Sequence, residues 1–263
     1  MAASEYIKYL LSVEEYSFSF DEVLQNTSKD HVAVRREINR LIQKREILNL
    51  RHGFYVIIPP RYSRAEKLPI QLYSEKLMAS LGRKYYIALY SAAKIHGASH
   101  QQIQKDYLMT EGPKLNTINK HHFHLQFHTT STWPEKNIET KQSDAGIYRI
   151  SSPVLTFVDL IHYQNKIGGL NRVLAPLEEL IEEITENDLE ALLTWYSSKS
   201  TLQRAGYLLE EVFSSFHLAD MIYETLHQQS FYPVLLYHTP NASPGSTKTR
   251  WKIDVNLLLE SDL

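Results

Sequence analysis

Residues 29–52 concentrate arginine, lysine and side-chain amides in a chain whose formal net charge is −2. At about 100° per residue, a helix over 29–44 gathers apolar side chains on one face. That face consists of Val34, Ile38, Leu41 and Ile42. The opposite face and its flanks carry guanidinium and amide groups, with further cations near both ends. The predicted polar surface consists of Lys29, Val32, Arg35, Arg36, Asn39, Arg40, Gln43 and Lys44.

These residue types can recognise base edges. Arginine can bridge two acceptors of guanine, and asparagine or glutamine can pair with adenine, through the major groove. Cations at the ends of such a helix can meet phosphates. The alternative is a solvated helix face that binds nothing, so the neighbouring elements decide between the two.

A short apolar two-strand pattern follows this helix and turns at His52-Gly53. Its apolar residues are Leu48 and Leu50 before the turn and Phe54, Val56 and Ile58 after it. Arg51 and His52 lie at the tip, where a hairpin can touch the DNA backbone. Two shorter helices are predicted earlier, over Ser4–Val13, with the serine as its cap, and over Asp21–Gln25.

Three helices followed by a hairpin are the parts of a winged helix-turn-helix, in the required order. This context favours double-stranded DNA as the partner of the polar helix face. Proteins of this kind usually meet palindromic sites in pairs, so self-association on DNA is compatible with the pattern.

The chain is long enough for two domains with separate cores, since it has 263 residues of which 43% are hydrophobic. The run at 57–69 holds three prolines and three basic residues, which breaks regular structure and predicts a linker. We therefore expect an α+β protein, with a winged helix-turn-helix over 1–62 and a larger mixed domain over 63–263.

Charge is distributed unevenly along the chain. The net charge is −4 over residues 1–28 and +6 over 29–67, then +4 over 68–150 and −8 over 151–263. This asymmetry suggests that only part of the chain faces a polyanion. Uneven surface charge without function is the alternative.

Composition excludes several classes of protein. No cysteine is present, so disulfides, zinc–thiolate sites and thiol chemistry are ruled out. The N-terminal residues do not resemble a signal peptide. No apolar run approaches the roughly 20 residues of a membrane span. We expect a cytoplasmic protein that makes no membrane contact.

The larger domain is predicted to mix helices and strands. The predicted helices are 72–81, 86–96, a stretch opened by Ser152-Pro153, an apolar stripe over 170–184, 188–196, 201–213 and 218–228. The predicted strands are 105–110, 121–128, 147–150, 234–237 and 251–255.

Four clustered histidines, His121, His122, His124 and His128, raise the possibility of a metal site. No acidic residue lies within their segment. The alternating Phe123, Leu125 and Phe127 already account for it as a strand with one buried face. We expect no metal and no cofactor.

Three other features have ordinary explanations. The carboxylates Glu178, Glu179, Glu182, Glu183 and Glu186 alternate with an apolar stripe, which favours a solvated face. Gly168-Gly169 lacks the spacing of a nucleotide-binding loop, so a turn between helices is the better account. Arg204 is either a buried ion-pair partner, for example of Asp159 or Glu210, or part of an anion-binding surface. No nucleophile–base–orienter arrangement is evident, and no catalytic activity is expected.

An RNA-binding module is the third class of function that the residues allow. Aromatic and basic residues interleave between 73 and 90 and could stack on unpaired bases. They are Tyr73, Arg83, Lys84, Tyr85, Tyr86 and Tyr90. The helical spacing of the tyrosines favours core packing instead.

Several segments resemble one known family in collinear order. They are RHGFYVI at 51–57, YYIALYSAAKIHGASHQQI at 85–103, IYRISSPVLTFVDLIHY at 147–163, GGLNRVLAPLEELIEEI at 168–184 and QRAGYLLEEV at 203–212. Together they resemble the AbiEi antitoxins of type IV toxin–antitoxin, or abortive-infection, systems. Such proteins usually carry a glycine where the recognition helix ends. Here the run is LIQKREIL, so Arg45 or Glu46 must leave the helix without it.

The resemblance implies a bifunctional bacterial protein. Its winged helix would bind inverted repeats upstream of its own operon and repress it. Its larger domain would neutralise a cognate nucleotidyltransferase-like toxin encoded alongside, without forming a stable complex with that toxin. The alternative is a winged-helix regulator that has no toxin partner.

Overall fold

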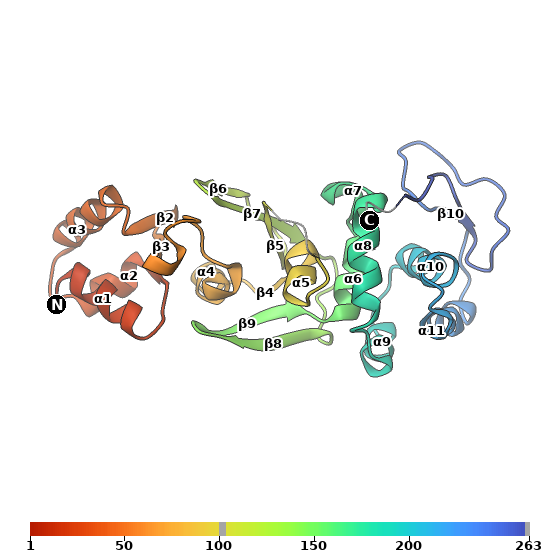
Figure 1. Cartoon of the computed structure of the whole chain (residues 1–263), viewed down its shortest axis with the longest axis horizontal. Coiled ribbons are helices and arrows are strands. Elements are labelled where there is room, and N and C mark those ends of the chain that lie inside the picture. The colour runs from red at the N-terminus through yellow and green to blue at the C-terminus, as the bar shows by residue number, and fades with distance from the viewer. Residues whose placement is uncertain (100–103, 261–263) are drawn as a thin grey trace. The chain divides into compact units, whose positions relative to one another are not determined.

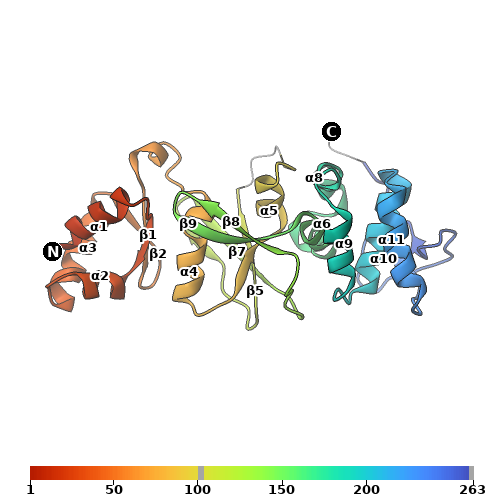
Figure 2. The ribbon, with the colours of Figure 1, turned by 90° about the horizontal axis from the view of Figure 1, so that it is seen from below.

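The computed structural model describes residues 1–99 and 104–260, and the chain divides into two compact units (Figures 1 and 2). The first unit contains the chain from Met1 to Ile87 and most of the strands up to Ile150. The second unit contains the helix that follows Ala88 and the chain from Ser151 onward. The final residues of the family-like segment 85–103 lie outside the described part.

The N-terminal part of the first unit packs three helices against a small sheet. Its elements are α1 (Ala3–Ser12), β1 (Ser17–Ser19), α2 (Phe20–Asn26), α3 (His31–Gln43), β2 (Ile47–Arg51) and β3 (Phe54–Ile57). Tyr6, Leu10, Phe18, Val34 and Ile38 are buried in one apolar cluster between them. The predicted helices are therefore confirmed, because each buries its apolar stripe in this core.

Two helix starts have identifiable caps. The carboxylate of Glu5 accepts a hydrogen bond of 2.7 Å from the backbone N–H of Ala2, so the predicted cap at Ser4 is wrong. Ser19 and Glu22 form a capping box at the start of α2, with bonds of 3.1 and 2.8 Å.

The strands of this sheet pair antiparallel in the order β1-β3-β2. Strand β1, which was not predicted from the sequence, pairs Ser17 with Val56 and Ser19 with Phe54. Because β3 is the central strand, all four of its residues are buried.

The segment predicted as a linker forms a short 3₁₀ turn, η1 (Pro60–Tyr62), and a second one, η2 (Ile70–Leu72), precedes α4 (Ser74–Ser80). The ammonium group of Lys76 on α4 pairs with Glu15 and, at 3.3 Å, with Glu22. These ion pairs join α4 to the N-terminal helices within the same unit.

A mixed sheet follows, with strand order β6-β7-β5-β4-β9-β8. Its strands are β4 (Tyr85–Ile87), β5 (Asp106–Thr110), β6 (Ile118–Lys120), β7 (Phe123–Thr129), β8 (Ile138–Ser143) and β9 (Gly146–Ser151). On β7, Phe123, Leu125 and Phe127 are buried, as their alternation predicts.

The prediction of a helix over 86–96 is wrong at its start. Residues 85–87 form β4, which pairs antiparallel with β5 and parallel with β9, and a shorter helix α5 (Leu89–Ile95) follows. Tyr85, Tyr86 and Ile87 are of residue types that favour strands, and all three are buried. Pairing with two distant strands decides their conformation.

The second unit is mainly helical. Its elements after α5 are α6 (Pro153–His162), α7 (Gln164–Ile167), α8 (Leu170–Ile181), α9 (Glu186–Leu193), α10 (Lys199–Tyr207), the π-helical turn η3 (Leu208–Val212), α11 (Phe216–His227), β10 (Val234–Leu235) and β11 (Ile253–Asp254). Helix α6 is buried from Val154 to Ile161 and packs against α5, α8, α9 and α10. Gly168 and Gly169, both with positive φ, form the predicted turn between helices.

Helix α10 holds the C-terminal segment through its QRAG run. The amide of Gln203 donates to the carbonyls of Tyr232 (2.9 Å) and Trp251 (2.8 Å). Gly206 lies directly under the buried Trp251 ring, where any side chain would overlap it. The run that contributes to the family resemblance therefore has a packing role.

Arg204 contacts backbone carbonyls, whereas its sequence context left open an ion pair or an anion-binding surface. Its Nε donates to the carbonyl oxygens of Leu235 and Leu236, both at 3.0 Å. Glu210, one predicted partner, instead accepts from Arg250 at 2.7 Å.

Within the described residues, no helix is both long enough and apolar enough to cross a bilayer.

Candidate nucleic-acid interface

Helix α3 is fixed by its apolar face and by an N-terminal cap. The carboxylate of Asp30 accepts a hydrogen bond of 2.8 Å from the backbone N–H of Ala33. Val34, Ile38 and Leu41 are buried. These contacts direct the polar face of the helix away from the core.

The residues predicted for the surface of α3 are all accessible. Val32 is 56% exposed, which is high for a side chain of its type. The exposed polar members are Lys29, Arg35, Arg36, Asn39, Arg40, Gln43 and Lys44. The helix brings together those from Val32 to Gln43, whereas Lys29 precedes it and Lys44 is its C-cap.

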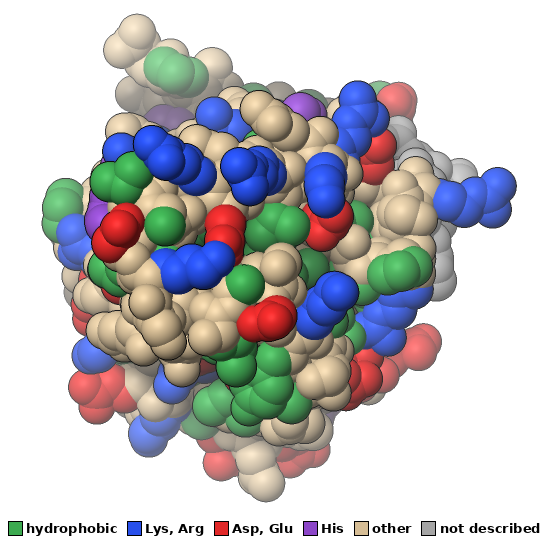
Figure 3. Space-filling model, turned by 90° about the vertical axis from the view of Figure 1, so that its left-hand side faces the viewer, with side chains coloured by type: hydrophobic (Ala, Val, Ile, Leu, Met, Phe, Trp, Pro, Cys, Tyr) green, Lys and Arg blue, Asp and Glu red, His purple; other side chains and the backbone are tan. Residues whose placement is uncertain are grey.

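The cations on this face have no acidic partners. Among the described residues, no carboxylate lies within ion-pair distance of Arg35, Arg36 or Arg40. Figure 3 shows the end of the chain that carries α1 to α3, with lysine and arginine side chains spread across its surface among scattered carboxylates. The guanidinium groups therefore remain free to meet an anion.

Lys29 differs from the other predicted residues because it has an internal partner. Its ammonium group pairs with the carboxylate of Glu37, which lies on α3, eight residues further along the chain. Glu37 also accepts a hydrogen bond of 2.7 Å from the backbone N–H of Ala3. The hydrogen bond from Lys29 lowers the pKa of the Glu37 carboxyl below its ordinary value. The carboxylate of Glu37 therefore connects α3 to the start of α1 and to the residue Lys29 that precedes α3.

The turn between β2 and β3 carries the two remaining predicted residues. Arg51 is half-buried and pairs with Phe54 across the strands, next to a shift in register after Asn49. His52 is exposed at the tip, and Gly53 has φ of +75°, a conformation that suits glycine. The turn therefore presents one cation and one imidazole.

Helix α3 ends in the way that the missing glycine predicted. Arg45 adopts φ of +59°, although it is not a glycine. The backbone N–H of Glu46 donates to the carbonyl of Leu41 at 3.1 Å, and that of Arg45 donates to Ile42 at 2.9 Å. These are the bonds of a Schellman-type helix end.

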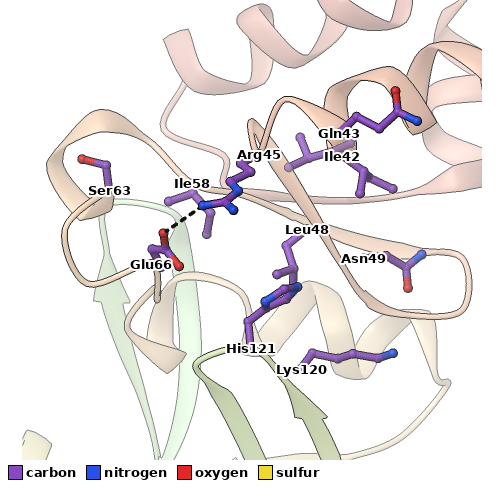
Figure 4. Close-up of a pocket in the computed structure, with 11 residues that line it drawn as sticks. Ile42, Gln43, Arg45, Leu48, Asn49, Ile58, Ser63, Glu66, Lys120 and His121 are labelled. Carbon is purple, nitrogen blue, oxygen red and sulfur yellow. Dashed lines mark ion pairs between the residues drawn. The ribbon is translucent and has the colours of Figure 1, made fainter.

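A pocket of about 580 Å³ lies beside this helix end, in the same unit (Figure 4). Its lining includes Gln43 and Arg45 from the end of α3, and Lys120 and His121 from the hairpin between β6 and β7. Nothing in the sequence indicates that this hairpin, some 75 residues further along the chain, lines a pocket together with the end of α3.

The clustered histidines do not converge. His122 lies 3.3 Å from Glu66, and His124 is 3.2 Å from the side-chain oxygen of Asn119. His121 occupies the turn before β7, and His128 is buried. Within residues 1–99 and 104–260, no three histidine or carboxylate side chains are placed to share a metal ion.

The glutamates between 178 and 186 and the tyrosines of the middle region also have structural explanations. Glu178 and Glu179 lie on α8, but Glu182 and Glu183 follow its end and Glu186 begins α9, so the five do not share one helix face. Glu178, Glu182, Glu183 and Glu186 are exposed to solvent, as predicted, and Glu179 is half-buried. The tyrosines proposed for base stacking are buried, so their faces are unavailable to RNA. They are Tyr73, Tyr85, Tyr86 and Tyr90.

Comparison with known proteins gives one family. Residues 86–211 match the family described as the AbiEi antitoxin C-terminal domain, so the resemblance is confirmed over that segment. No curated protein matches the chain.

Two solved structures match this chain. The crystal structure of the RV2827C protein from Mycobacterium tuberculosis shares 15% identity, with a TM-score of 0.67 over 95% of this chain and 90% of that one. An antigenic nucleotidyltransferase-like protein from Paracoccidioides brasiliensis shares 10% identity, with a TM-score of 0.38 over 55% of this chain and 88% of that one. The first similarity extends over both units and concerns the fold alone.

Proposed function

We propose that this chain, whose residues 86–211 are an AbiEi antitoxin C-terminal domain, is a bacterial antitoxin that also represses its own operon. It acts by binding and carries out no catalytic step. The antitoxin domain implies a toxin partner, and the family resemblance makes that partner a nucleotidyltransferase-like protein encoded alongside. Such a repressor works in the bacterial cytoplasm, where its operator is.

The repressor role rests on the N-terminal part, which we interpret as a winged helix-turn-helix. In that arrangement α3 enters the major groove and the β2–β3 turn follows the DNA backbone. Under this proposal Arg36 and Asn39 read base edges, while Lys44 and Arg51 contact phosphates.

The observation that carries this proposal is the accessibility of the cations on α3. Arg35, Arg36 and Arg40 are exposed, and none has a carboxylate partner among the described residues. Helix faces that serve only solubility usually interleave charges of both signs. Here the acidic residue of the helix, Glu37, is turned toward Lys29 and Ala3.

Base recognition is tested with Arg36→Ala and Asn39→Ala in the full chain. Each is expected to weaken binding to the inverted repeats upstream of the operon by about 1–3 kcal/mol, and binding to random duplex by less. Arg64→Ala is a matched control, because Arg64 is exposed but lies outside α3 and the turn. Equal affinities for Arg36→Ala and the control would remove α3 from the interface.

Backbone contact is tested with Arg51→Ala. Because a phosphate contact carries no sequence information, this variant should bind all duplexes more weakly. Its plot of log affinity against log salt should lose about one unit of slope. An unchanged slope would show that the β2–β3 turn does not touch the DNA.

Neutralisation is tested by growth rescue in cells that express the product of the neighbouring reading frame. The proposed boundary between residues 62 and 63 suggests a truncated chain, but Lys76 pairs with Glu15 and Glu22 across that boundary. Point variants therefore separate the two roles more cleanly. The double variant Arg36→Ala/Asn39→Ala should lose repression and still rescue growth. If the wild-type chain binds the operator yet rescues nothing, it is a regulator without a toxin partner.

A further inference from the structure

We propose that the pocket beside the end of α3 binds a small organic anion that has an apolar body and one acidic head group. The matched family domain begins at residue 86, so it includes Lys120 and His121 of the β6–β7 hairpin but not the end of α3 or strand β2, and its description names no ligand. The pocket lies within the first unit, between the end of α3, strand β2 and the β6–β7 hairpin.

The size and walls of the pocket suit a small molecule. Its volume of about 580 Å³ is within the range of roughly 300–1,000 Å³ found for ligand sites. Four aliphatic side chains are among the residues that line it. They are Ile42, Ile47, Leu48 and Ile58. An apolar body placed there would remove these side chains from water.

The charges at the pocket favour an anion. The carboxylate of Glu66 is 3.9 Å from the guanidinium of Arg45, which offsets its charge, and 3.3 Å from the imidazole of His122. Lys120 is exposed, and among the described residues no carboxylate lies within ion-pair distance of it. Its ammonium group is therefore the unpaired charge of the pocket.

Three charged or polar lining residues adopt a backbone conformation that side chains other than glycine rarely take. Arg45, Glu66 and His121 have φ of +59°, +45° and +49°. Each comes from a different part of the chain, and all three line this one pocket. Backbone strain of this kind concentrates where side chains must be aimed at a ligand.

Figure 4 shows how these side chains lie around the pocket. Arg45 and Glu66 point toward each other on one side, and Leu48 and His121 both line the pocket. Lys120 extends beneath them from the β6 strand. One ligand can therefore place its acidic head group near Lys120 and its apolar body against Leu48.

The test uses the full chain and the probe 8-anilinonaphthalene-1-sulfonate, whose aromatic rings and single sulfonate match the proposed chemistry. Its fluorescence should rise saturably, with one site per chain. N-phenyl-1-naphthylamine, which has the rings without the sulfonate, should bind more weakly. Inorganic sulfate at the same concentration should not displace the probe, because it has no apolar body.

Two variants locate the site. Lys120→Gln should weaken probe binding about three- to fivefold, as expected for one partly solvent-exposed charge pair. Lys114→Gln is the matched control, since Lys114 is equally exposed but does not line the pocket. Leu48→Trp should fill the pocket and remove saturable binding. If that variant does not fold, the comparison between the two lysine variants decides.

Several results would overturn the proposal. These are equal binding by Lys120→Gln and Lys114→Gln, equal binding of the charged and uncharged probes, and saturable binding that a folded Leu48→Trp variant retains. One consequence rests on the proposed function: because Gln43 belongs to both the pocket and the α3 surface, operator DNA should displace the probe. Probe titration without DNA separates a failure of the pocket from a failure of the repressor model.

Discussion

The arginines of α3 differ in what they contact from two arginines of the second unit, Arg204 and Arg250. Arg35, Arg36 and Arg40 are exposed and have no carboxylate partner among the described residues. Arg204 donates to the carbonyls of Leu235, Leu236 and Ser200. Arg250 bridges Glu210 and Asp220 at 2.7 and 2.6 Å. The guanidinium groups of α3 are available to a ligand, whereas those of Arg204 and Arg250 donate hydrogen bonds within the fold.

This difference assigns separate roles to the same residue type. A guanidinium with satisfied donors stabilises the folded chain, and removing it leaves acceptors without partners. A guanidinium whose donors are free contributes little to folding and is placed for recognition. Variants of the two sets should therefore separate stability from DNA binding.

The largest effect is expected for Arg204→Met, which keeps an apolar stem but removes the donors. The carbonyls of Leu235, Leu236 and Ser200 lose a charged donor, which should lower the free energy of unfolding by about 2–3 kcal/mol. Urea unfolding followed by tryptophan fluorescence measures it, because Trp195 and Trp251 are both in this unit.

Arg172→Met is the matched control for that experiment. Arg172 is an exposed arginine of the same unit, and its guanidinium lies 5.7 Å from the centre of the Tyr90 ring. Its loss should cost less than about 1 kcal/mol, as for an exposed cation–π contact. Equal losses from the two variants would mean that the carbonyl contacts of Arg204 do not stabilise the fold.

A smaller effect is expected for Arg250→Ala. The ion pairs with Glu210 and Asp220 are partly exposed, so their removal should lower the free energy of unfolding by about 1–2 kcal/mol. Asp220→Asn should cost less, because that carboxylate is 58% exposed and Glu210 remains paired. If Asp220→Asn costs as much as Arg250→Ala, the bridge to Glu210 contributes nothing.

Local periodicity was sufficient to predict the helices of the N-terminal part and the exposed face of α3. Val34, Ile38 and Leu41 form an apolar stripe within one helix, so the opposite face of α3 is polar whatever the stripe packs against. Strands were harder to predict. Residues 17–19 and 85–87 form strands only through pairing with Val56 and Leu108, among others, far along the chain. Three residues carry too little pattern to reveal such pairing.

The pocket could not be predicted for a related reason. Its two halves, around Arg45 and around His121, come from distant segments that tertiary folding brings together. The missing glycine at Arg45 did predict an unusual helix end, which the φ of +59° confirms. A single sequence shows that such a strained residue exists, but not what its side chain faces.

A smaller, pH-dependent effect on the free energy of unfolding is expected from Glu37, whose carboxylate contacts Lys29 and the backbone of Ala3. The pKa of Glu37 is lowered from its ordinary value of 4.5, chiefly by the hydrogen bond from Lys29. A carboxyl whose pKa is lower in the folded state stabilises it above that ordinary value, and the contribution disappears as pH falls through the folded pKa. The pair is partly exposed, so we expect less than about 1 kcal/mol.

Unfolding of wild type and Glu37→Gln at about pH 6 and pH 3.5 measures this contribution. Their difference in the free energy of unfolding should be present at the higher pH and shrink at the lower one. A difference that is the same at both values would show that the charge of Glu37 has no part in fixing α3.

The smallest effect on folding is expected for Arg40→Ala, and this result tests the comparison most directly. A cation in the last turn of α3 gains a few tenths of a kcal/mol from the helix dipole, while alanine gains a similar amount in helix propensity. The free energy of unfolding should therefore change by less than about 0.5 kcal/mol. Affinity for duplex DNA should nevertheless fall, with a shallower salt dependence. Loss of stability without loss of affinity would place Arg40 with the structural arginines of the second unit.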